Sequence, residues 1–310
     1  MKIYPVTEHT RLHFVHPPRK GFISVIVPVY KDHQGLSDTL ESLARQTLSQ
    51  KRFEVIVGND SADPACTKVC RKYSFVREVA TETNSGAYAM RNLAIEASRG
   101  EYLAFTDADI RVPPYWLETF LVHFSQGLDY IGGDVIIDPE KIRTLTNRLV
   151  AEYEFDNKDV FAKHHFIPTA NVAVRRSVME TIGGFDRRLY SSGDCEFGDR
   201  VFRHGMYRQF YIESIPVIHP PRDYDAFMKK LARISRGQAD LRAYYPERFG
   251  NSGGVSICNE FRRAFYIPHI KSARNSIDKI MLTGLVVWFQ LWRALNNVKN
   301  SLLLRSKKGK

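Results

Sequence analysis

Residues 22–29 read FISVIVPV, and this stretch decides the fold class of the chain. It is apolar, rich in β-branched residues and nearly continuous, which is typical of a strand buried on both faces of a parallel sheet. Similar apolar runs follow at 53–57, 76–80 and 102–105, and segments with helical spacing separate them. This alternation predicts an α/β domain with a mostly parallel central sheet.

The second half of the chain is less regular. We expect strands at 129–137, 172–174, 207–211 and 215–218, and a helix at 195–204. From about Asp223 onward the pattern becomes helical.

Composition narrows the class of protein. The chain has 310 residues, 44% of them hydrophobic, which suits one large domain or one domain with an appendage. The net charge of +11 favours anionic partners: nucleic acid, an acidic membrane surface or phosphorylated substrates. No nucleic-acid-binding motif is present, and the first strand lacks the glycine pattern of a dinucleotide oxidoreductase, so both classes are disfavoured. The four cysteines lack metal-site spacing and are expected to be free thiols in a reducing cytosol.

Three carboxylates follow predicted strands: Asp60, Asp107 and Asp109. Ligands of parallel sheets bind at the carboxyl ends of the strands, where these residues fall. In an extended segment Asp107 and Asp109 face the same side, so both can aim at one divalent cation. Mg²⁺ and Mn²⁺ prefer oxygen ligands and commonly bridge protein carboxylates to a diphosphate. The alternatives are a solvated turn for the Asp107–Asp109 pair and an Asx-turn for Asp60, which otherwise could accept a nucleobase N–H.

Two further residues carry a structural and a functional interpretation each. Asp194 precedes a predicted helix, where it can act as an N-cap or as the general base for a hydroxyl group. His219 follows a short predicted strand, and it is either a structural histidine or a metal ligand.

Together these pieces resemble the inverting family 2 glycosyltransferases, which have the GT-A fold, from about Ser24 to Arg236. The blocks that carry the resemblance are SVIVPVY (24–30), EVIVGNDSADP (54–64), NSGAYAMRNLAI (84–95), EYLAFTDADIRVPPYWLE (101–118), TANVAVRRSVMETIGGFD (169–186) and GDCEFGDR (193–200). Each block is modest alone, and their order and spacing are specific.

The resemblance implies roles for individual residues. Pro28, Val29, Tyr30 and Asp60 line the nucleoside pocket, and Gly86 and Arg91 lie near the base and ribose. Asp107 and Asp109 match the D-x-D pair, which binds donor and metal, with Asp109 contacting the metal most directly. Asp194 matches the catalytic base, His219 lies near the metal and diphosphate, and Arg233 and Arg236 fall where some members bring basic residues to the diphosphate.

By the same resemblance, the chain has an N-terminal extension (1–20), a GT-A domain (21–225) and a C-terminal helical region (226–310). Residues 21–112 form the donor half of the domain and residues 113–225 the acceptor half. The sugar and the acceptor are expected to be selected by loop residues 137–168 and the acceptor cleft.

The sequence departs from the family pattern at three positions. Asn59 stands where an aspartate is frequent, Lys31 replaces the usual asparagine after Tyr30, and Gly193 replaces a frequent glutamate before Asp194. The Q-x-x-R-W signature of processive synthases is also missing, so transfer of a single sugar is expected.

The implied enzyme uses Mn²⁺ or Mg²⁺ and moves a sugar, with inversion, from a UDP-sugar to a glycan or lipid-linked hydroxyl acceptor. The expected setting is cell-surface or extracellular polysaccharide or glycolipid biosynthesis. The alternative is a catalytically inert protein that binds nucleotide sugars or glycans. The intact Asp107, Asp109 and Asp194 speak against it.

The C-terminal region contains the apolar run IMLTGLVVWFQLW, residues 280–292. At about 1.5 Å per residue it is too short for a hydrocarbon core about 30 Å thick. It is either a buried core helix or a helix lying in the cytoplasmic face of an anionic membrane. Trp288 and Trp292 suit that interface, and the basic residues that follow would meet anionic headgroups.

Overall fold

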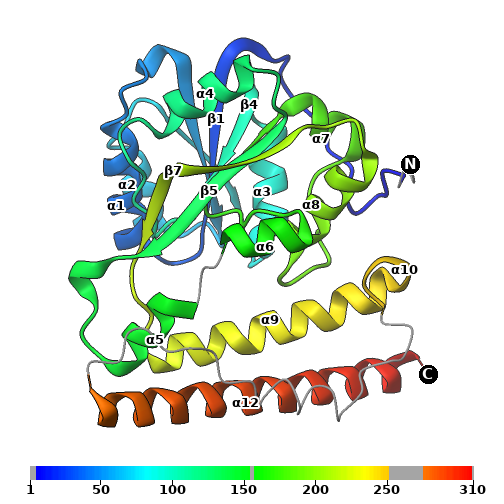
Figure 1. Cartoon of the computed structure of the whole chain (residues 1–310). Helices are drawn as coiled ribbons and strands as arrows, with labels where there is room; N and C mark the ends of the chain where they lie inside the picture. The colour runs from blue at the N-terminus through cyan, green and yellow to red at the C-terminus, as the bar shows by residue number, and fades with distance from the viewer. Residues whose placement is uncertain (1–4, 154–156, 251–274, 309–310) are drawn as a thin grey trace. The chain divides into compact units, whose positions relative to one another are not determined.

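The computed structural model describes residues 5–153, 157–250 and 275–308 and divides into two compact units (Figure 1). The first unit comprises Met1–Ile136, Asp156–Arg188 and Gly193–Pro220. The second comprises Ile137–Phe155, Leu189–Ser192 and Pro221–Lys310.

The first unit is built on a seven-stranded sheet in the order β3-β2-β1-β4-β6-β5-β7. Its parallel part contains β1 (Arg19–Val29), β2 (Phe53–Asp60), β3 (Val76–Thr81) and β4 (Gly100–Phe105). The core of β1 is almost fully buried, which explains its continuous apolar sequence. The predicted α/β fold with a mostly parallel sheet is confirmed.

The remaining strands are β5 (Tyr130–Ile137), β6 (Val172–Arg175) and β7 (Gln209–His219), and β6 pairs antiparallel with β4 and β5. The two short strands predicted at 207–218 form the single strand β7, so that prediction was wrong. Glu213 and Ser214 interrupt the apolar pattern because they are exposed on a strand at the end of the sheet order, and they resemble a turn in the sequence.

Helices cover the sheet and connect its strands. Those of the first unit are α1 (His33–Ala44), α2 (Pro64–Cys70), α3 (Ala87–Glu96), α4 (Trp116–Ser125), α6 (Asn157–His164), α7 (Arg176–Ile182) and α8 (Gly193–His204), with the short 3₁₀ turn η1 (Gln50–Arg52) before β2. Helix α3 packs on β1 and β2, so residues of its first turns reach the carboxyl ends of those strands.

The second unit consists of η2 (Pro139–Lys141), α5 (Leu145–Tyr153), α9 (Tyr224–Tyr244), α10 (Pro246–Phe249) and α12 (Ser276–Lys308). Helices α9 and α12 run side by side in the same direction (Figure 1), with Phe227 against Phe289 and Ser235 hydrogen-bonded to Asn297. The predicted C-terminal helical region is therefore present.

The apolar run at 280–292 lies inside α12 and has two different faces. Leu282, Val286 and Phe289 belong to the core of the second unit, whereas Ile280 and Trp288 are exposed. Among the described residues, no helix is long and apolar enough to cross a membrane.

The described cysteines, Cys66, Cys70 and Cys195, are free thiols as expected. Burial raises the pKa of the Cys66 and Cys70 thiols to about 12, which keeps them protonated and unreactive. Cys258 lies outside the described residues.

Candidate active site

The order of the parallel strands in the sheet reverses at β1. From β1 the sheet grows in one direction through β2 and β3, and in the other direction through β4. Ligands of open α/β sheets bind where the strand order reverses in this way. Tyr30 follows β1, Asp60 ends β2 and Asp107 follows β4, so the structure brings these predicted residues to one edge.

Asp60 organises the loop before α3. Its Oδ1 accepts hydrogen bonds from the Ser85 N–H at 2.7 Å and the Thr81 hydroxyl at 3.1 Å, and its Oδ2 accepts from the Gly86 N–H at 2.9 Å. Gly86 has a φ of 86°, which glycine adopts without strain, and a side chain there would meet only open space. Gly86 is thus required for the backbone conformation at which α3 begins.

The neighbouring Asn59 explains one departure from the family pattern. Its Oδ1 accepts from the Asp63 N–H at 3.0 Å, so the side chain that holds the turn after β2 is Asn59 and not Asp60. Its Nδ2 donates to the Glu78 carboxylate at 2.6 Å. An aspartate at position 59 would place a second carboxylate against that of Glu78. The amide of Asn59 instead donates a hydrogen bond to the Glu78 carboxylate.

The Asp107–Asp109 segment differs from the extended conformation assumed in the sequence analysis. It is a turn, since the Ile110 N–H donates to the Asp107 carbonyl at 3.3 Å. The two carboxylates consequently have different partners. Asp107 accepts from Nη2 of the buried Arg91 at 2.5 Å, whereas Asp109 faces His219.

His219 reaches this turn through backbone pairing. Arg111 and Ile218 exchange two N–H···O bonds of 2.9 Å each, which joins the end of β7 to the segment after Asp109. The Nε2 atom of His219 then lies 3.4 Å from Oδ2 of Asp109. Because Nδ1 contacts the Pro220 carbonyl at 2.5 Å, Nδ1 carries a proton and Nε2 points its lone pair at the carboxylate in the neutral ring.

Oδ2 of Asp109 and Nε2 of the neutral His219 ring are both acceptors. A cation between them would interact favourably with both, and protonation of the imidazole would also remove the conflict. In the described part of the chain, no group of three or more His, Cys, Asp or Glu side chains is placed to hold a metal ion. Mg²⁺ commonly needs only one or two carboxylates beside substrate phosphates and water. The Asp109–His219 pair therefore fits a cation that a diphosphate helps to hold.

Asp194 lies on a different element, in the first turn of α8. The helix begins at Gly193, so Asp194 is inside the helix and not its N-cap. Its Oδ1 accepts from the Tyr88 hydroxyl at 3.3 Å and from the Cys195 N–H at 3.0 Å. Burial raises the pKa of the Asp194 carboxyl above its usual range, against the opposing effects of Arg91 and these two hydrogen bonds.

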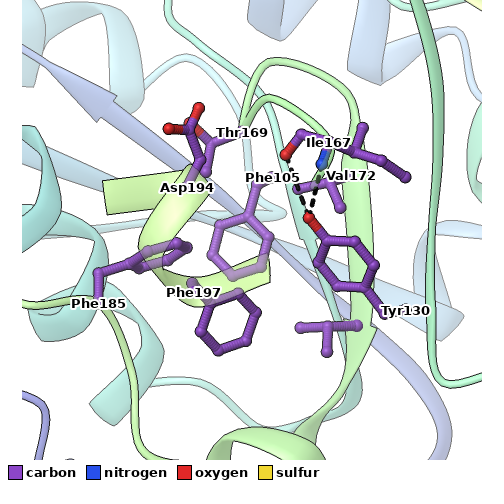
Figure 2. A pocket seen from close by; sticks show the side chains of 9 residues that line it. Phe105, Tyr130, Ile167, Thr169, Val172, Phe185, Asp194 and Phe197 are labelled. Atoms are coloured by element: carbon purple, nitrogen blue, oxygen red, sulfur yellow. Dashed lines mark hydrogen bonds between the residues drawn. The ribbon is translucent and has the colours of Figure 1, made fainter. Parts of the chain in front are cut away.

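An apolar pocket beside Asp194 accounts for this desolvation. Figure 2 shows the rings of Phe105, Phe185 and Phe197 gathered on one side of the carboxyl. Phe185 packs against both other rings, at centroid distances of 5.5 and 5.2 Å. A carboxyl beside such a surface loses hydration, and its charged form is disfavoured. A base with a raised pKa is closer to the value that suits proton abstraction near neutral pH.

Sequence reasoning missed Tyr88, although it lies three residues before Arg91 on the same face of α3. Tyr88 is buried, and its ring fills the space beside Gly193, where an added Cβ would lie 2.8 Å from the ring. Gly193 therefore replaces the larger residue frequent in the family because Tyr88 occupies the room for a side chain.

The other predicted residues fall in two places. Pro28, Val29 and Tyr30 lie at the end of β1, with Tyr30 about half exposed and Val29 buried. Arg236 lies on α9 in the second unit, where its guanidinium stacks on Tyr190 at 4.8 Å.

An α/β sheet whose strand order reverses, with acidic residues at the point of reversal, is the architecture of the GT-A enzymes. The sequence profile of glycosyl transferase family 2 matches residues 24–183. This chain belongs to that family, and the resemblance stated from its motifs is confirmed.

Two relatives illustrate the match. The chain is 29% identical over 304 residues to the glycosyltransferase AglE of Haloferax volcanii, covering 92% of this chain and 97% of the relative. It is 24% identical over 233 residues to the probable glycosyltransferase YdaM of Bacillus subtilis, covering 69% and 54% of the two chains.

Solved structures share the fold. The S. aureus TarS 1–349 complex with UDP-GlcNAc matches with a TM-score of 0.55 at 17% identity, covering 92% of both chains. The mannosyltransferase PcManGT of Pyrobaculum calidifontis, in complex with GDP-Man and Mn²⁺, matches with a TM-score of 0.61 at 13% identity, covering 89% of this chain and 86% of that chain. The protein is thus a GT-A-type glycosyltransferase.

Proposed function

We propose that the protein transfers one sugar from a UDP-sugar to a hydroxyl acceptor with inversion, and that Asp194 is the general base. The observation that carries the proposal is the environment of Asp194: a half-buried carboxyl against an aromatic wall, oriented by Tyr88. Its carboxylate takes the acceptor proton while the hydroxyl oxygen attacks the anomeric carbon from the face opposite the leaving diphosphate. One such displacement inverts the anomeric configuration.

Donor binding is assigned to the edge formed by β1, β2 and β4. Tyr30 and the Asp60-organised loop lie at that edge, and Arg91 supplies a buried cation. Within the described residues, Nε of Arg91 has no hydrogen-bond partner, which leaves a donor available to a ribose or phosphate oxygen.

The pair Asp109 and His219, with Asp107 beside it, would hold Mn²⁺ or Mg²⁺ together with the diphosphate. When bound, such an ion neutralises the leaving group. The Mn²⁺ in the PcManGT complex supports this assignment by fold analogy.

The acceptor in this proposal is a glycan or lipid-linked hydroxyl at the cytoplasmic face of a membrane, in polysaccharide or glycolipid synthesis. Support comes from α12, whose residues Ile277, Ile280, Met281, Trp288 and Leu295 are exposed. At about 100° per residue they fall within one stripe, opposite the face that Leu282 and Val286 bury. Lys299 lies in the same stripe, and six of the seven charged residues of α12 are basic, which suits anionic headgroups.

A nucleotide-sugar panel tests the proposal. Thermal stability of the full chain is measured with Mn²⁺ and UDP-glucose, UDP-N-acetylglucosamine, UDP-galactose, UDP-glucuronate or GDP-mannose. A ligand that binds the native state raises the melting temperature, so one UDP-sugar should stabilise the protein more than UDP alone. Stabilisation by none of them would reject the donor class.

A further inference from the structure

Phe185 is the central ring of the aromatic wall beside Asp194, which also contains Phe105 and Phe197 (Figure 2). It packs against both of the other rings and is itself almost fully buried. All four residues belong to the first unit. Because a ring that lies against a carboxyl keeps water away from it, the contacts that hold Phe185 bear on the hydration of Asp194.

The amide of Asn92 holds the backbone of Phe185. Asn92 lies on α3 and is fully buried. Its Nδ2 donates to the Phe185 carbonyl at 2.7 Å, and its Oδ1 accepts from the Phe185 N–H at 3.0 Å. A side-chain amide supplies both the donor and the acceptor that this backbone pairing needs. Asn92 thus fixes the backbone from which the Phe185 ring projects.

Gly184, one residue before Phe185, is held from two other sides. Its N–H donates to the Thr10 carbonyl at 2.7 Å, and its carbonyl accepts from Arg200 on α8, the helix that also carries Asp194. An added Cβ at Gly184 would lie 2.6 Å from Oδ1 of Asn92, so the loop packs directly on this amide. The loop is therefore tied to α8 at Gly184 and to α3 at Phe185.

We infer that Asn92 is a positioning residue for the general base: by holding the backbone of Phe185, it keeps the Phe185 ring against the Asp194 carboxyl. This inference rests on the proposed role of Asp194. Without the amide, the ring can move and water reaches the carboxyl. The pKa of Asp194 should then fall toward its usual range, because burial is the largest cause of its rise. A weaker base takes the acceptor proton less readily.

The test measures the pKa of Asp194 in the full chain. Carboxyl ¹³C NMR of aspartate-labelled protein follows the titration, and the Asp194 signal is assigned by its absence from Asp194→Asn. Asn92→Ala should lower this pKa and speed amide exchange of Phe185. In UDP release from UDP-glucose or UDP-N-acetylglucosamine to water, it should lower kcat about tenfold, which is part of the roughly 10²–10⁴-fold that a general base contributes.

Ser98→Ala is the matched control. Ser98 is as buried as Asn92 and lies just after the same helix, and its hydroxyl donates to the Ile95 carbonyl at 2.6 Å. Its loss should lower the stability of the fold and leave the pKa of Asp194 unchanged. Both variants keep the titratable groups that face the Asp194 carboxyl from α3, β5 and α8: Tyr88, Arg91, Tyr130 and Cys195.

An unchanged or raised pKa of Asp194 in Asn92→Ala, or an equal fall in Ser98→Ala, would overturn the inference. If Asn92→Ala does not fold, Gly184→Ala decides, since its added Cβ forces the loop and the Asn92 amide apart. It should also lower the pKa of Asp194, and an unchanged pKa would again overturn the inference. A fully active Asp194→Asn variant would instead refute the proposed function, whatever the pKa shows, so the two failures are distinguishable.

Discussion

The Tyr88 hydroxyl lies 3.3 Å from Oδ1 of Asp194, which joins the first turn of α3 to the first turn of α8 across 106 residues of sequence. Burial raises the pKa of the Tyr88 phenol, so Tyr88 remains the proton donor in this pair. The hydrogen bond favours the charged form of Asp194 and partly offsets its desolvation.

Tyr88→Phe removes that hydrogen bond and keeps the ring. The pKa of Asp194 should then rise further, and since a base acts when deprotonated, the acid limb of the kcat profile should move to higher pH. The measurement is kcat against pH for wild type and variant. An acid limb that stays in place, or moves to lower pH, would show that Tyr88 does not tune Asp194.

Asp109→Ala removes one of the two groups proposed to hold the cation. Because the ion and the diphosphate bind together, Mn²⁺ should no longer strengthen UDP binding, and transfer should be lost. Calorimetric titration of UDP with Mn²⁺ or with excess EDTA measures this, with the exposed Asp159→Ala as the control carboxylate. Full transfer activity in excess EDTA would contradict the metal assignment.

Glu196→Ala should destabilise the fold strongly. Glu196 is fully buried and bonds Arg200 through three contacts of 2.8–3.0 Å, while Arg200 also donates to the Ile182 and Gly184 carbonyls. Removing one partner of a buried pair leaves an uncompensated charge, at a cost of about 3–5 kcal/mol. Urea denaturation measures the change in the free energy of unfolding.

The control for that prediction is Glu41→Ala on α1. Glu41 pairs with Arg45 on the surface, with both side chains more than half exposed, so its loss should cost less than about 1 kcal/mol. Equal destabilisation by the two variants would mean that burial of the Glu196 pair is irrelevant.

The exposed stripe of α12 predicts binding to anionic vesicles. Ile280→Asp and Trp288→Asp place a charge in the stripe and should reduce co-sedimentation with phosphatidylglycerol vesicles by about tenfold or more, since burying a charged group in place of an apolar one is costly. Val122→Asp on α4 is the matched control, because Val122 is as exposed as Trp288 but lies in the first unit. Equal binding by all variants, or none by wild type at low salt, would assign the stripe another role.

Much of the sheet edge that we propose binds the donor could be predicted from sequence, because buried strands have a recognisable apolar pattern. The apolar runs of β1, β2 and β4 are continuous, so the residues that follow them, Asp60 and Asp107, could be placed at one edge. Strand β7 was harder because its middle is exposed and polar.

Contacts between residues that lie far apart in the sequence could not be predicted from the sequence pattern. Asp109 faces His219 because a bridge between Arg111 and Ile218 brings the end of β7 to this turn, and no local signal in the sequence indicates that bridge. The environment of Asp194 likewise depends on Tyr88, which the sequence analysis did not single out. Its spacing from Arg91 on α3 was the available signal.

The central claim is that Asp194 is the general base, and turnover of Asp194→Asn tests it most directly. Because the raised pKa of Asp194 means that the folded state disfavours the carboxylate, the neutral variant should be at least as stable as wild type at neutral pH. It should bind UDP with Mn²⁺ normally and lose sugar transfer by about 10²- to 10⁴-fold. A folded Asp194→Asn protein with turnover near that of wild type would contradict the claim.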